Sequence, residues 1–150
     1  MVPAQNIRAR VALVAQTVGT ATSNVYGNNI DCSGFDSATF IIEARSATVT
    51  SIPDRVIIEH SDITESTGFV AIATISSGLP TEVNNTAVTQ QATYGVVNVD
   101  LRGKRRYLRL GLRGNSTHAM TASSVCLLDL PAAAPTNATA AGALFFRALG

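Results

Sequence analysis

Short segments in which apolar and polar residues alternate recur along most of the chain. The clearest alternation places Leu108, Leu110 and Leu112 between Tyr107, Arg109, Gly111 and Arg113. Successive side chains of a β-strand point to opposite faces. Residues 107–113 are therefore predicted to form a strand with one apolar face and one face turned to water or to a partner.

Six further segments have the composition of strands. Valine, isoleucine and threonine are abundant in the chain, and glycine and asparagine separate the apolar runs. We expect these strands at residues 10–16, 36–44, 55–60, 69–75, 95–101 and 124–130. The last of them is apolar on both faces, so it is expected to lie centrally in a sheet or to be covered.

The alternation also assigns side chains to shared faces. The expected sets are Val11, Leu13 and Ala15; Ala38, Phe40, Ile42 and Ala44; Phe69, Ala71, Ala73 and Ile75; and Val97, Val99 and Leu101. Seven or eight short strands separated by turns are typical of an antiparallel β-sandwich or a jelly roll. The chain is therefore predicted to be all-β, with few and short helices.

The length of 150 residues suits a single domain. Composition changes at Leu130, so we assign residues 1–9 to an extended N-terminal arm, 10–130 to the β-sandwich domain and 131–150 to an Ala- and Pro-rich C-terminal tail. A tail of this kind cannot build its own core, although it ends in the apolar residues Leu144, Phe145, Phe146 and Leu149. Either the tail packs on its own sandwich or it docks on a neighbouring subunit, and the N-terminal arm has the same two possibilities.

The composition favours a compact apolar protein that buries surface against partners. Hydrophobic residues make up 46% of the chain and charged residues 14%, whereas soluble domains average about 25% charged residues. A net charge of +1 argues for neither nucleic acid nor an anionic membrane as a partner. No apolar run is long enough for a transmembrane helix, and the stretch VALVA near the N-terminus is too short for a secretory signal.

Residues suited to catalysis are few. The run from Glu59 to Asp62 contains a nucleophile, a base and two carboxylates. Neighbouring side chains of a strand point to opposite faces, so Ser61 is not expected to reach His60 as a catalytic pair requires. An esterase-like enzyme that uses these two residues is the only enzymatic alternative, and we expect no catalytic residues.

Metal-ligating and redox patterns are equally sparse. A metal site at His60 and His118 would need a third ligand that the sequence does not nominate. Cys32 and Cys126 are isolated from each other in sequence and are interpreted as small buried residues. We therefore expect no metal and no cofactor.

Six of the eleven basic residues lie within twelve positions, on an expected hairpin turn and the strand that follows it. They are Arg102, Lys104, Arg105, Arg106, Arg109 and Arg113. Arginine outnumbers lysine ten to one in the chain, and its planar guanidinium suits paired hydrogen bonds to carboxylates and phosphates at interfaces. Acidic residues gather elsewhere, at Asp54, Glu59, Asp62 and Glu65.

This charge segregation suits subunits that meet through unlike charges. The basic cluster and the four apolar residues of the tail are therefore the candidate interface. A solvated turn with ordinary surface arginines is the alternative. Nucleic-acid binding is a third interpretation, which the net charge of +1 and the single nearby aromatic residue, Tyr107, weaken.

Four segments carry a resemblance to a known family. They are Ile30-Asp31, GFDSATF at residues 34–40, VIIEHSD at 56–62 and GKRRYLRLGL at 103–112. Together they resemble the small head proteins that decorate or cement the capsids of tailed bacteriophages. The resemblance implies a β-sandwich or jelly-roll subunit, a dimer or trimer, that binds the major capsid protein on the outer face of the shell. It also implies a virion protein made in the host cytoplasm, with no catalytic residues, cofactor, membrane partner or direct nucleic-acid partner.

A carbohydrate- or receptor-binding β-sandwich on the virion surface is the alternative function. Such a module would be expected to offer a shallow aromatic groove. The chain has no tryptophan, and its only tyrosines are Tyr26, Tyr94 and Tyr107. The sequence therefore favours the decoration protein.

Overall fold

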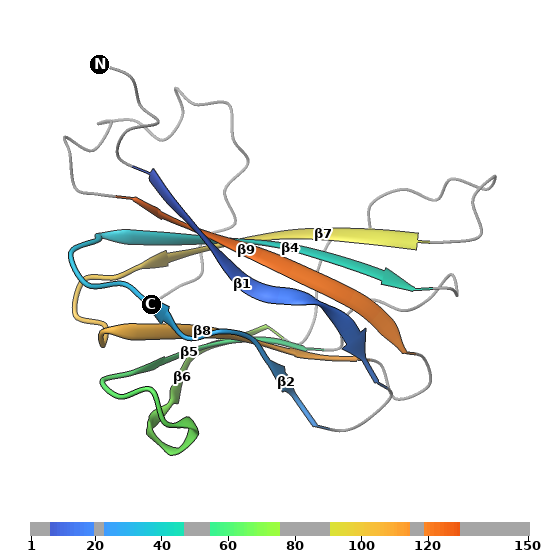
Figure 1. The fold of residues 1–150 in the computed structure, drawn as a ribbon, viewed down its shortest axis with the longest axis horizontal. Helices are drawn as coiled ribbons and strands as arrows, with labels where there is room; N and C mark the ends of the chain where they lie inside the picture. Colours follow the sequence, from blue (N-terminus) through green and yellow to red (C-terminus); the bar gives the residue numbers. More distant parts are fainter. Residues whose placement is uncertain (1–6, 20–22, 47–54, 76–90, 115–118, 130–150) are drawn as a thin grey trace.

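The computed structural model describes residues 7–19, 23–46, 55–75, 91–114 and 119–129, which form two β-sheets packed face to face (Figure 1). Sheet A has the strand order β1-β9-β4-β7. All of its pairings are antiparallel. Its strands are β1 (Ile7–Val18), β9 (Met120–Asp129), β4 (Ser37–Ser46) and β7 (Gln91–Asp100).

Sheet B has the strand order β2-β8-β5-β6, and the short strand β3 also pairs with β8. Its strands are β2 (Val25–Tyr26), β3 (Ile30–Asp31), β8 (Tyr107–Arg113), β5 (Arg55–Ser61) and β6 (Val70–Ile75). A 3-10 turn (Ser66–Gly68) precedes β6. Within the described ranges, no helix has the length and apolar character needed to cross a lipid bilayer.

The strands pair in a nested order along the chain. In sheet A the first strand pairs with the last, β1 with β9, and β4 pairs with β7. In sheet B, β2 and β3 pair with β8, and β5 pairs with β6. Successive nested pairs thus alternate between the two sheets, as in a long hairpin rolled up on itself. This is the arrangement of a jelly roll, an architecture of two packed antiparallel sheets, and the predicted all-β fold is confirmed.

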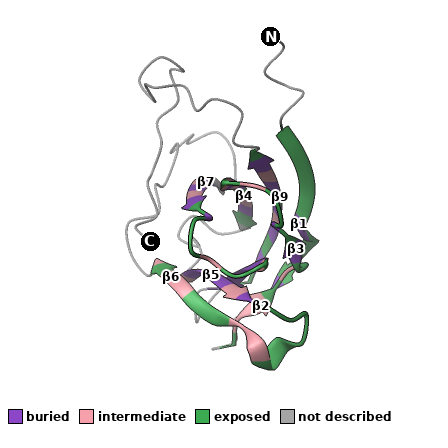
Figure 2. Ribbon diagram, turned by 90° about the vertical axis from the view of Figure 1, so that its left-hand side faces the viewer, coloured by how far each residue is buried: buried purple, intermediate pink, exposed green. Residues whose placement is uncertain are grey.

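The core lies between the sheets and follows the alternation in sequence. Phe40 of β4 and Leu128 of β9 are fully buried on the inner face of sheet A, and Ile58 and Leu110 are fully buried on the inner face of sheet B. Purple segments alternate with pink or green ones along several strands in Figure 2, as expected when one face of each strand packs inward. The strand predicted to lie centrally, β9, does so, between β1 and β4.

All seven predicted strands are present. In two of them, β1 and β6, the side chains predicted to share one face do not all do so. In β1 the register with β9 shifts between Val11 and Leu13. Leu13 is consequently buried while Val11 is 54% exposed. In β6 a register shift opposite Ile58 and Glu59 separates Ala73 from Ala71. A β-bulge inserts a residue and moves the following side chains to the other face, so strict alternation fails at both places.

The chain ends differ from the predicted boundaries where the structure describes them. Strand β1 begins at Ile7, so residues 7–9 of the expected N-terminal arm belong to the sheet. The rest of that arm and the whole C-terminal tail lie outside the described residues. The candidate interface residues Leu144, Phe145, Phe146 and Leu149 lie there too and remain a prediction.

Both cysteines are small buried residues, as the sequence indicated. Cys32 and Cys126 belong to the core, and neither forms a disulfide. Burial disfavours the charged thiolate, and it raises the pKa of each thiol to about 12.

Replacing the central core leucine of β8 tests the assignment of faces. Leu110 is fully buried, so Leu110→Ala is expected to lower the free energy of unfolding by about 2–5 kcal/mol through lost burial and a residual cavity. Val70→Ala, at a residue that is 51% exposed, is the control and is expected to cost less than about 0.5 kcal/mol. Urea denaturation followed by circular dichroism measures both, and equal losses would contradict the face assignment.

Candidate functional site

The turn after β7 carries most of the basic cluster and links the two sheets. Strand β7 belongs to sheet A and β8 to sheet B, so residues 101–106 are an inter-sheet connection and not the hairpin turn that the sequence suggested. Gly103 has a φ of +71°, a left-handed conformation that glycine adopts at little cost. The backbone amide of Lys104 donates to the carbonyl of Leu101 at 2.9 Å and closes the turn.

Ion pairs within the chain hold this turn in place. Arg102 contacts Asp100 at 2.6 Å, and Arg106 contacts Asp31 of β3 at 2.7 Å. Hydrogen bonding from Arg102 lowers the pKa of Asp100 to about 2. Hydrogen bonding from Arg106 likewise lowers the pKa of Asp31.

A third contact ties the turn to the segment after β5. Arg105 lies 3.6 Å from Asp62 and also donates to the carbonyl oxygen of Gly68. The backbone amide of Arg105 donates to Nδ1 of His60 at 3.2 Å. The turn is therefore anchored through both backbone and side-chain contacts.

Arg109 has a different environment, because it is covered. It is 8% exposed, and its Nε lies 2.6 Å from Oε2 of Glu59, which is also 8% exposed. The guanidinium carbon lies 4.0 Å from the ring centroid of Tyr26 and 4.1 Å from that of Phe69. Such contacts are attractive, since the face of an aromatic ring carries partial negative charge.

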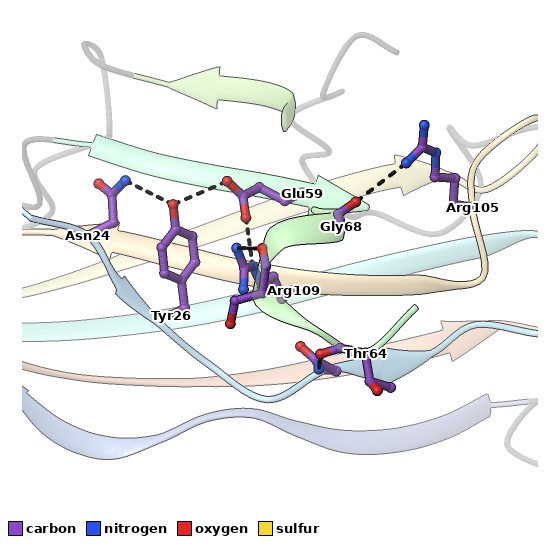
Figure 3. Close-up of polar contacts among 9 residues, drawn as sticks. Asn24, Tyr26, Glu59, Thr64, Gly68, Arg105 and Arg109 are labelled. Atoms are coloured by element: carbon purple, nitrogen blue, oxygen red, sulfur yellow. Dashed lines mark hydrogen bonds and ion pairs between the residues drawn. The ribbon is translucent and has the colours of Figure 1, made fainter. Parts of the chain in front are cut away.

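Tyr26 extends this arrangement into a hydrogen-bonded chain (Figure 3). Its hydroxyl donates to Oε1 of Glu59 at 3.2 Å and accepts a hydrogen bond from Nδ2 of Asn24 at 3.1 Å. The Tyr26 ring lies against Gly111, where an added Cβ would come within 2.7 Å of the ring. Glycine at this position in β8 therefore lets the tyrosine close over the sheet.

The basic cluster is thus not one continuous patch. Arg102, Lys104, Arg105 and Arg106 surround the inter-sheet turn, whereas Arg109 is buried and Arg113 lies at the opposite end of β8. Two of the acidic residues that lie apart from the basic cluster in sequence pair with it inside the chain, Glu59 with Arg109 and Asp62 with Arg105. The four residues around the turn are the part of the predicted cluster that the structure brings together at the surface.

The run from Glu59 to Asp62 takes part in these structural contacts. Ser61 is fully buried, and its Oγ accepts a hydrogen bond from the backbone amide of Ile63 at 3.0 Å. His60 accepts a hydrogen bond from the backbone amide of Arg105. In the part of the chain that the structure describes, no three His, Cys, Asp or Glu side chains gather into a possible metal site. His118 and Asp54 lie outside the described residues.

Sequence reasoning missed an exposed apolar row on the outer face of sheet A. Val11, Val125, Ile41 and Val96 stand side by side in register across its four strands. The first three are 54%, 40% and 42% exposed, and Val96 is half-buried. We call these four residues the valine row. The apolar character of both faces of β9 was the available signal, but pairing partners were needed to align the four residues.

Comparison with known proteins finds similar folds at low identity. No family model matches the chain, and no curated protein does either. A chain from the structure of infectious bursal disease virus Gx strain matches at a TM-score of 0.49 and 9% identity, over 85% of this chain and 33% of that one. This chain therefore spans about a third of the length of that protein.

One prophage-derived protein and one bacterial protein are similar to this chain at comparable TM-scores and sequence identities. The SPBc2 prophage-derived protein YomS matches at a TM-score of 0.41 and 13% identity, over 81% of this chain and 93% of its own. The K1 adhesin domain of Lys-gingipain from Porphyromonas gingivalis W83 matches at 0.47 and 13% identity, over 79% and 71% of the two chains. Likeness at this level identifies no relative, so function is argued from the residues.

Removing Arg109 is expected to destabilise the fold strongly. Arg109→Ala leaves the Glu59 carboxylate buried without its partner, which costs about 3–5 kcal/mol in comparable buried pairs. Arg102→Ala is the matched control, since its pair with Asp100 is exposed, and it is expected to leave stability nearly unchanged. The double variant Arg109→Met with Glu59→Leu is expected to recover much of the loss, because no charge is then buried alone. Urea denaturation measures all three, and equal losses for both arginines would contradict this account.

His60 is expected to make stability depend on pH. Burial, then the charges of Arg105 and Lys104, lower the pKa of His60 in the folded chain, while Asp62 acts in the opposite direction. The unfolded chain therefore binds more protons near the ordinary histidine pKa of about 6.5, and stability falls as pH decreases through that value. Protonation also removes the acceptor for the Arg105 amide.

The measurement is the denaturation midpoint of wild type, His60→Gln and His118→Gln between about pH 7.5 and about pH 5.5, the range of histidine titration. His60→Gln is expected to flatten the pH dependence, because glutamine does not titrate and its oxygen is a hydrogen-bond acceptor. His118→Gln serves as the control for the only other histidine. A steep dependence that survives in His60→Gln would contradict the assignment.

Proposed function

We propose that this chain is a structural virion protein that decorates or cements the outer surface of a phage capsid and links subunits of the major capsid protein. The resemblance of four segments to tailed-phage decoration proteins supports the proposal. The jelly roll supports it as well, since that architecture occurs in viral capsid proteins, although it also occurs in lectins and cupins. A fold alone does not assign a function, whereas the inter-sheet turn offers a specific surface for binding.

The anchored basic turn is the observation that carries the proposal. Ion pairs and the hydrogen bond to His60 hold Arg102, Arg105 and Arg106 at one end of the sandwich. The backbone amide of Lys104 donates to Leu101 within the same turn. A guanidinium has five N–H donors, and Arg106 directs two of its nitrogens at Asp31. Donors therefore remain for carboxylates on an acidic shell surface, and the turn loses little entropy on binding because it is already ordered.

A shell presents the same binding site many times, which removes the need for a tight single contact. Exposed ion pairs contribute about 0–1 kcal/mol each, so one turn gives weak binding. A subunit or oligomer that touches several lattice sites at once gains from the high effective concentration of the second contact. Binding to the assembled lattice alone also stabilises that lattice by linkage. The proposed role is therefore mechanical and requires no chemistry.

The carbohydrate- or receptor-binding alternative has less support from the described tyrosines. Arg109 covers one face of the Tyr26 ring, and Arg106 lies over the Tyr107 ring at 5.1 Å. Stacking of a sugar needs a free aromatic face, and these contacts occupy part of that surface. Specific binding on a glycan array, together with no binding to shells, would favour the alternative.

Binding to empty shells tests the proposal. Empty shells assembled from the major capsid protein of a tailed phage are mixed with the purified chain and sedimented. The wild-type chain is expected to sediment with the shells and to be released as salt rises, because ionic strength screens exposed charges. An unrelated β-sandwich of similar size is the reference, and equal binding by that reference would contradict the proposal.

The variant Lys104→Ala with Arg105→Ala tests the role of the turn. It is expected to bind at least tenfold more weakly at low salt and to approach wild type at high salt. Arg8→Ala with Arg10→Ala removes the same charge from exposed positions of β1 and is the matched control. Equal weakening by the two double variants would show that net charge matters and the turn does not.

A further inference from the structure

The outer face of sheet A departs from the usual pattern of a solvated sheet. An antiparallel sheet with one face in water normally presents polar residues there. The valine row instead places four aliphatic side chains next to one another across all four strands. Val14 of β1 is 61% exposed and adds to the apolar surface of the same edge strand. Contiguous exposed apolar patches mark sites of interaction.

Polar residues of β4 and β7 border the valine row, on both sides in β4. On one side, Oγ1 of Thr39 donates to Oδ1 of Asn98 across β4 and β7 at 2.6 Å. On the other side, Glu43 and Arg45 of β4 form an ion pair at 2.6 Å. An apolar centre with a polar rim is the anatomy of a protein–protein interface. The charges of this rim neutralise each other, so the face does not require a charged partner.

The size of the face matches that of an interface between subunits. Strands β4, β7 and β9 are 10 residues long and β1 is 12. With strands about 4.8 Å apart and about 3.3 Å per residue, the flat face measures roughly 600 Å². Its accessible area is larger because side chains stand out from the sheet, and stable interfaces bury about 800 Å² per partner. The whole face is therefore needed, and a short peptide would cover only part of it.

We propose that the outer face of sheet A is a self-association surface that packs on the same face of a second copy of this chain. Flat sheet faces pack well on other sheet faces, as the two sheets of a sandwich do. A two-fold axis between the copies and parallel to their strands reverses the valine row, so four aliphatic side chains meet four. The contact is isologous and closes after two subunits. This inference does not depend on binding to a capsid.

Light scattering coupled to size exclusion tests the inference on the full chain at micromolar concentrations. Wild type is expected at twice the 15.6 kDa of one chain. Val125→Lys and Ile41→Lys each place a charge in the centre of the row and are expected to give the monomer mass. Val70→Lys changes a valine that is 51% exposed, somewhat more than Val125 and Ile41, on β6 of sheet B, and is expected to remain a dimer. Circular dichroism checks that each variant is folded, and Val125→Thr replaces any lysine variant that is not.

Three results would overturn the inference. One is a wild-type monomer across the concentration range, and another is a dimer that persists in the folded valine-row variants. The third is a dimer that deletion of residues 131–150 abolishes while the valine-row variants retain it, because the tail would then be the contact. Shell binding is measured separately. A monomer that still binds shells would contradict this inference and would not contradict the proposed function.

Discussion

The buried pair of Arg109 and Glu59 is the interaction on which the outer half of sheet B depends. Strand β8 pairs with β2, β3 and β5, and Arg109 lies next to its centre, between the residues that pair with β3 and those that pair with β2. A charge at this place is tolerable only when it is neutralised and hydrogen-bonded. Glu59 supplies the opposite charge, Tyr26 and Phe69 enclose the guanidinium, and the segment between β5 and β6 closes over it. Losing one partner would leave the other charged and buried.

The two sheets consequently present different outer surfaces. On the outer side of sheet B, Arg109 and Glu59 pair with each other, and the exposed basic residues of this sheet lie mainly at the inter-sheet turn. Sheet A keeps an apolar row in solvent, where covering it gains free energy in proportion to the area removed from water. The two proposed contacts follow this division, self-association through the outer face of sheet A and attachment through the inter-sheet turn.

The alternation of apolar residues predicted the fold well, because it reports burial directly. All seven predicted strands exist, and Leu108, Leu110 and Leu112 face the core as expected. Strands β2 and β3 were not predicted, because a strand of two residues is too short to show an alternation of apolar and polar positions. The bulges in β1 and β6 move the side chains that follow them to the other face of the strand. They could not be predicted, because an inserted residue has no characteristic composition.

The candidate site was less predictable because it depends on contacts between distant positions. Arg109 and Glu59 are separated by 50 positions, and Arg106 and Asp31 by 75. Arg109, Glu59 and Arg106 belonged to the two charge clusters seen in the sequence, whereas Asp31 belonged to neither. Pairing inside the chain and pairing between subunits give the same composition. The valine row required the register of four strands.

Electron cryomicroscopy of shells incubated with a saturating amount of the chain tests the central claim most directly. We expect regularly repeating density of the size of a jelly roll on the outer surface of the shell, with the inter-sheet turn directed toward the capsid protein. A map identical to that of untreated shells would contradict it.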